Sequence, residues 1–133
     1  MNTQEILIFI GLTLIAIIIA KIKIKFQKKI SEKDKNFIKT KWQKITNTNN
    51  NNQAILDADK LLQISLQKIG IKGSVGEQLK NKNNKISNIN EIWEAHKIRN
   101  KIAHEFFEPN EKETQLTLKK YKKTIEEIIK TKL

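Results

Sequence analysis

Apolar and polar positions recur along this chain with the spacing of helices. Apolar residues return at intervals of three and four, which places them on one helical face, and no segment alternates with the period of two expected of a strand. The pattern predicts helices over residues 31–45, 54–69 and 74–79, from about 88 to 105, and from about 110 onward. We therefore expect an all-α fold built as a small antiparallel helical bundle.

Residues with preferences for helix ends mark the predicted boundaries. Ser31 is suited to an N-terminal cap, and Ser74 begins a sequence with the spacing of a capping box. Gly70 follows the longest regular apolar face at the position where helices commonly end. The polar runs Asn47–Asn52 and 81–85 predict loops.

The N-terminal segment has a different pattern. From Ile6 to Ala20 every residue is apolar or small except Thr13, and alternating apolar residues continue to Ile24. About 20 residues make about 30 Å of helix, so we expect a single membrane-spanning helix whose flanking lysines reach the interface. A cleaved signal peptide is the alternative, but Glu5 precedes the apolar run and lysine follows Ala20, which favours an uncleaved anchor.

The charge distribution sets the expected orientation. The formal net charge is +12, and ten lysines with only two acidic residues lie between positions 21 and 44. The positive-inside rule therefore predicts a single-pass protein of the plasma membrane with its N-terminus outside and the following domain in the cytoplasm. It also predicts that the lipid bilayer is a partner, with anionic head groups at Lys21–Lys29.

These patterns divide the chain into three parts. Residues 1–30 are the expected anchor with its basic flank, 31–49 a juxtamembrane helix with an Asn-rich linker, and 50–133 the helical domain. Whether residues 31–46 pack on the membrane or on the bundle stays open. A core of this size is near the lower limit for independent folding, so we expect a homodimer.

Composition narrows the chemistry. The chain has no cysteine, which excludes disulfides, zinc fingers, iron–sulfur sites and thiol nucleophiles. It also has no Walker loop, dinucleotide fingerprint or metal-ligand cluster, so we expect no metal and no cofactor. Of the 26 basic residues only Arg99 is arginine. A lone arginine among lysines indicates a site that needs a planar, permanently charged fork of donors, with chance retention as the alternative.

Arg99 lies on the same predicted helix as both histidines. His96, Asn100 and His104 follow at i, i+4 and i+8 on one flank, with Arg99 on the neighbouring one. Arg99 and His104 are about 140° apart around the axis and about 7.5 Å apart along it. Their side chains can converge on one phosphate only across a cleft, against another helix or a symmetry mate.

The pattern around this helix resembles that of HEPN domains. The resemblance covers about residues 50–132 and rests on an R-x4-H motif, Arg99–Asn100 to His104, together with three flanking segments. Those segments are Ala58-Asp59-Lys60-Leu61-Leu62 followed by Gly70, then Gly76-Glu77-x-Leu79-Lys80, and Trp93-x-Ala95-His96.

The resemblance implies a four-helix up-and-down bundle that dimerises around the motif, and metal-independent cleavage of RNA to 2′,3′-cyclic phosphate ends. His104 would then act as acid and base, Arg99 would bind phosphate, and Asn100 would orient one of them. His96 is an accessory candidate, or a packing residue hydrogen-bonded to backbone. Glu105 is a second accessory candidate, or a solvated charge. We expect Trp93 in the core, with base stacking as the alternative.

A non-catalytic interpretation stands beside the enzymatic one. Arg99 could cap the carbonyls of a neighbouring helix, and Asn100 with His104 could hydrogen-bond across a dimer interface. The fold also serves as a nucleotide- or RNA-binding module, or as a scaffold or sensor that binds another protein, such as a neutralising antitoxin. Fold analogy alone does not establish chemistry, so whether the chain is an enzyme stays open at this point.

Overall fold

The computed structural model describes residues 2–25, 29–81 and 86–133, with backbone alone for residues 20–25. The described residues form six α-helices and no strand, so the prediction of a helical bundle is confirmed. The helices are α1 (Thr3–Lys25), α2 (Glu32–Thr46), α3 (Asn51–Lys68), α4 (Val75–Asn81), α5 (Ile89–His104) and α6 (Glu111–Ile129).

Side chains at the helix ends explain where several of these helices begin and end. The side chains of Ser31, Asn50 and Asn110 each accept a hydrogen bond from a backbone N–H in the first turn of α2, α3 and α6. After α3 the chain reverses at Gly70, whose φ of 93° suits a residue without a Cβ. The Ser74 hydroxyl and the Glu77 carboxylate form the predicted capping box before α4.

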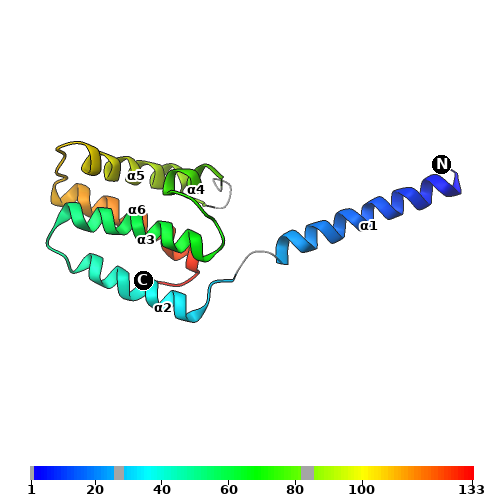
Figure 1. The fold of residues 1–133 in the computed structure, drawn as a ribbon, viewed down its shortest axis with the longest axis horizontal. Helices are drawn as coiled ribbons and strands as arrows, with labels where there is room; N and C mark the ends of the chain where they lie inside the picture. Colours follow the sequence, from blue (N-terminus) through cyan, green and yellow to red (C-terminus); the bar gives the residue numbers. More distant parts are fainter. Residues whose placement is uncertain (1, 26–28, 82–85) are drawn as a thin grey trace.

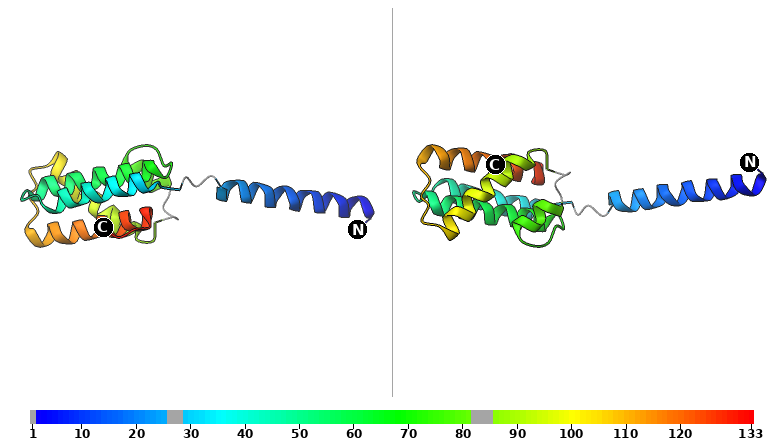
Figure 2. Two further views of the ribbon diagram at one scale, coloured as in Figure 1. Left: turned by 90° about the horizontal axis from the view of Figure 1, so that it is seen from below. Right: turned by 90° about the horizontal axis from the view of Figure 1, so that it is seen from above.

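The bundle is arranged around α3. This helix packs against α2, α4, α5 and α6, and α6 also packs against α5. Consecutive long helices run in opposite directions, so α2, α3, α5 and α6 form an up-and-down arrangement (Figures 1 and 2). Fully buried side chains from α2, α3, α5 and α6 meet in one core, among them Ile38, Leu62, Ile92 and Tyr121.

The structure answers the question that the sequence left open for α2. Ile38, Trp42 and Ile45 lie on one face of this helix and are buried in the same core as the residues of α3. An ion pair also joins α2 to α3, with Lys68 Nζ 2.8 Å from Asp34 Oδ1. Helix α2 therefore belongs to the bundle.

The prediction of a transmembrane helix is wrong. Within the part of the chain that the structure describes, no helix is both long enough and apolar enough to cross a bilayer. The run from Ile6 to Ala20 covers only about 22 Å as a helix, against a hydrocarbon thickness of about 30 Å. The predicted span depended on extending this run past Lys21 and Lys23.

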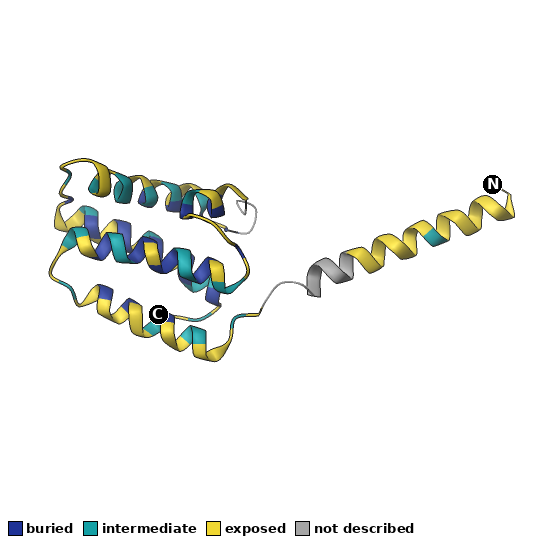
Figure 3. Cartoon of the chain, viewed as in Figure 1, coloured by how far each residue is buried: buried dark blue, intermediate teal, exposed yellow. Residues whose placement is uncertain are grey.

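The predicted plasma-membrane localisation and orientation depended on that span and are overturned by the same finding. The basic flank Lys21–Lys29, to which we assigned the anionic head groups, has side chains outside the described residues except for Lys29. Helix α1 projects away from the bundle (Figure 1). Its side chains from Ile6 to Ile19 are almost all exposed in the chain taken alone (Figure 3).

One loop prediction also needs correction. We expected Asn47–Asn52 to be a loop, but α3 begins at Asn51. The reason is the Asn50 side chain, which accepts a hydrogen bond from the Gln53 backbone N–H at 2.9 Å and so starts the helix inside the polar run. Most of the predicted loop 81–85 lies outside the described residues.

Candidate functional site

A buried carboxylate joins three helices beside the predicted motif. Asp59 of α3 is only 4% exposed. Its Oδ1 accepts a hydrogen bond from the Tyr121 hydroxyl of α6 at 2.9 Å and lies 2.8 Å from His96 Nδ1 of α5. Its Oδ2 lies 3.4 Å from Arg99 Nε. A buried charge of this kind is tolerated because it is paired and hydrogen-bonded.

The environment of Tyr121 keeps its hydroxyl protonated. Burial raises the pKa of Tyr121 well above the usual value near 10, and the negative charge of Asp59 and the hydrogen bond to it raise that pKa further. The phenol is therefore a permanent donor to Asp59 at any physiological pH.

His96 is held by this carboxylate. Its side chain is 12% exposed, and the ring of Trp93 meets it edge-on with centroids 5.9 Å apart. We considered His96 either a titrating accessory residue or a packing residue bonded to backbone. The partner of its Nδ1 is a carboxylate rather than a backbone group, and its role as an accessory residue stays a prediction. Trp93 is partly buried and packs against the core.

Arg99 is anchored at one end and accessible at the other. Its Nε is buried and faces Asp59 without an aligned hydrogen bond, so the contact is an ion pair. Its Nη1 donates to Asn100 Oδ1 at 3.1 Å. The side chain as a whole is 34% exposed. A guanidinium fixed in this way can present its remaining N–H groups to an anion at the surface.

His104 lies apart from this cluster. It is the last residue of α5 and is exposed, and within the described ranges its side chain has no hydrogen bond or ion pair. The helical geometry that separates it from Arg99 is that of a regular α-helix, so one chain does not bring the two side chains together. Glu105 is the C-cap residue of α5 and is also exposed.

Neither Asp59 nor Tyr121 is among the site residues that the sequence pattern predicts. A signal for Asp59 was present, because Ile55, Asp59, Leu62 and Leu66 lie at i, i+4, i+7 and i+11. A carboxylate in that apolar stripe must be buried, and a buried carboxylate needs donors from other helices. Nothing in the pattern indicates which donors those are.

Among the described residues, no group of three or more histidine, aspartate and glutamate side chains is placed to hold a metal ion. Comparison with known proteins finds no matching family model, no matching curated protein and no matching solved structure.

Proposed function

We propose that this chain is a HEPN-like, metal-independent endoribonuclease in which Arg99 binds the scissile phosphate and His104 transfers protons. One observation carries the proposal. Arg99, the only arginine of the chain, forms an ion pair with buried Asp59 through Nε, while its side chain stays partly exposed and its Nη1 donates to Asn100. A preorganised guanidinium stabilises negative charge that builds on phosphate oxygens during transfer.

The reaction needs a base and an acid. One imidazole takes the proton of a ribose 2′-hydroxyl, and the 2′-oxygen then forms a bond to phosphorus. The bond from phosphorus to the 5′-oxygen breaks, and a second imidazole gives that oxygen a proton. The products are a 2′,3′-cyclic phosphate and a 5′-hydroxyl end, and no electron is gained or lost.

Two copies of the chain supply both imidazoles. Arg99 and His104 diverge on α5, so a two-fold dimer with the two α5 helices lining one cleft would place two arginines and two histidines around one phosphodiester. The His104 side chains would then serve as base and acid. His96 is not needed for this role, because Asp59 holds it at its Nδ1.

The test is incubation of the 133-residue chain with total RNA in the presence of EDTA. We expect cleavage with 2′,3′-cyclic phosphate ends, and no cleavage by an Arg99→Ala/His104→Ala variant prepared in the same way. Wild-type protein that is folded and leaves every RNA intact contradicts the proposal.

One observation favours a second candidate, a non-catalytic RNA- or protein-binding module. His96 and Arg99 both engage the same buried carboxylate, an arrangement that also serves to hold α5 on α3. In that case the wild-type chain binds RNA or a partner protein without cleaving anything. Arg99→Ala lowers the stability of the fold under either candidate, because buried Asp59 loses a partner, so the cleavage assay on folded wild-type protein separates the two candidates.

A further inference from the structure

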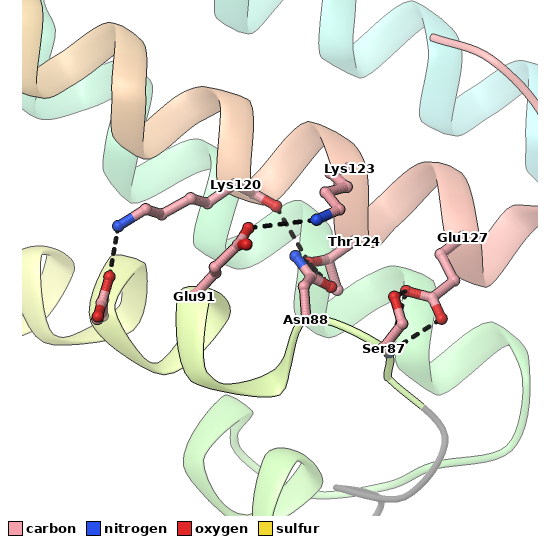
Figure 4. A network of polar contacts seen from close by, with 8 residues as sticks. Ser87, Asn88, Glu91, Lys120, Lys123, Thr124 and Glu127 are labelled. Carbon is pink, nitrogen blue, oxygen red and sulfur yellow. Dashed lines mark hydrogen bonds and ion pairs between the residues drawn. The ribbon is translucent and has the colours of Figure 1, made fainter.

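Helices α5 and α6 pack side by side, and hydrogen bonds and ion pairs join them near the N-terminal end of α5. The polar groups there pair in antiparallel register, each step along α5 matching a step back along α6 (Figure 4). The pairs are Ser87 with Glu127 (3.0 Å), Asn88 with Thr124 (2.9 Å), Glu91 with Lys123 (3.5 Å) and Glu94 with Lys120 (2.6 Å). The two helices are joined tightly in this part.

Beyond Glu94 and Lys120 the pairing stops and a groove opens between the helices. Its volume is about 580 Å³, and four lysines and two glutamates contribute to its lining. The same register brings Lys101 opposite Glu113, yet Lys101 Nζ lies over the ring of Phe107, 5.4 Å from its centroid. Within the described residues, Lys97, Lys101 and Lys112 form no ion pair, although Lys97 is close enough to Glu94 to help lower the pKa of that carboxyl group.

The groove also has apolar and aromatic components. Ile98 and Leu116 belong to its lining, and Leu116 is 52% exposed. Phe106, on the loop that connects α5 to α6, is fully exposed. Lysines without an ion pair along a groove, apolar lining residues and an exposed aromatic ring on the loop at its end form a combination that suits single-stranded nucleic acid.

One residue of the proposed site, His104, lies on the same face of α5 as two lysines of the groove. Lys97, Lys101 and His104 lie at i, i+4 and i+7, so they share one face of α5. This face is not the one that carries Arg99 to Asp59. A strand that followed the lysines along α5 would therefore arrive at His104.

We propose that the α5–α6 groove binds the backbone of single-stranded RNA, with Lys97, Lys101 and Lys112 on phosphates and Phe106 stacked on a base. This inference rests on the proposed function, because it assigns the groove to the substrate of that reaction. Phosphate binding by lysine as a point charge also agrees with the composition, which keeps arginine only at position 99.

The test measures binding without cleavage. The probe is a fluorescein-labelled 2′-O-methyl oligouridylate of about 12 nucleotides, which has no free 2′-hydroxyl and is not cut. Fluorescence anisotropy compares wild type with Lys97→Gln/Lys101→Gln/Lys112→Gln. The matched control, Lys33→Gln/Lys44→Gln/Lys72→Gln, removes the same charge from exposed lysines outside the groove.

We expect binding of the probe by the groove variant to depend less on salt, because three lysines that contact phosphates have been removed. The slope of log K against log salt should fall by about 0.7 per lysine, or about 2 in all, and the control slope should stay near that of wild type. Phe106→Ala should weaken binding at least about fivefold through lost stacking. Circular dichroism verifies that each variant is folded.

Three results overturn the inference. They are equal slopes for the groove and control variants, no binding of the probe by wild type, and equally effective competition by polyglutamate, which would indicate an acidic protein as the occupant. The matching all-ribose oligonucleotide tests the proposed function separately. If it is bound through the groove but never cut, the groove stands and the nuclease proposal fails.

Discussion

At the residue scale, one buried carboxylate organises the candidate site. Asp59 takes a hydrogen bond from Tyr121, holds His96 at Nδ1 and pairs with Arg99 Nε, so three helices depend on one side chain. Such a network is stabilising only while all its members are satisfied. Removing a donor therefore costs more than the hydrogen bond itself, because it leaves a buried charge less well paired.

Tyr121→Phe tests this network. At neutral pH we expect the free energy of unfolding to fall by about 1–3 kcal/mol, because Asp59 loses a buried donor. Urea unfolding followed by circular dichroism measures the change. The control is Thr40→Val, whose hydroxyl is exposed and bonds only within its own helix; it should change stability by less than about 0.5 kcal/mol.

Because the pKa of Tyr121 is raised in the folded chain, the difference in stability between wild type and Tyr121→Phe should depend on pH. Its contribution to stability is complete below the unfolded pKa of about 10 and is lost as the pH rises further, since the unfolded chain then releases a proton that the folded chain keeps. Above that pH the stability of wild type should fall more steeply than that of Tyr121→Phe, by about 1.4 kcal/mol per pH unit. Equal slopes for the two proteins would refute the assignment.

Not every residue of the site was equally predictable. Arg99, Asn100 and His104 could be proposed because their types and spacing are visible within one helix. The contacts of Asp59 could not be proposed in this way, because His96 lies 37 positions and Tyr121 lies 62 positions from Asp59 along the chain. Only the packing of α3 against α5 and α6 brings them together, and periodicity does not specify which faces meet.

At the element scale, helix positions were predictable and helix partners were less so. Caps such as Ser31 and Gly70 act locally, so the sequence alone places them. The sequence does not show whether α2 joins the bundle. The structure shows it, because Ile38, Trp42 and Ile45 are buried where α2 packs against α3. The apolar run at Ile6–Ala20 misled us because its length was extended across lysines.

Trp42→Ala tests the membership of α2 in the bundle. Trp42 is 5% exposed and lies in the common core, so we expect the whole domain to lose about 3–5 kcal/mol in one cooperative transition. Phe37→Ala is the matched control on the same helix, where Phe37 is 41% exposed and the loss should be much smaller. An unchanged unfolding midpoint for Trp42→Ala would show that α2 folds apart from the other helices.

At the scale of the whole molecule, the proposed function requires two copies of the chain. The 133-residue chain should behave as a two-fold dimer in light scattering coupled to size exclusion, with dissociation on dilution. Mixing wild type with an excess of His104→Ala should suppress cleavage, since a mixed dimer keeps only one of the two imidazoles that the reaction needs. A mass that stays monomeric at high concentration contradicts the shared cleft.

The most direct test of the account is the Arg99→Lys variant in the RNA cleavage assay. This protein uses lysine at 25 of its 26 basic positions, so a site that needed only charge would be served by lysine as well. We predict that Arg99→Lys unfolds within a few degrees of wild type and loses about 10²-fold or more in cleavage rate, as His104→Ala does. An Arg99→Lys protein that cleaves RNA like wild type, or that does not fold, would contradict the assignment of Arg99 as the phosphate-binding residue.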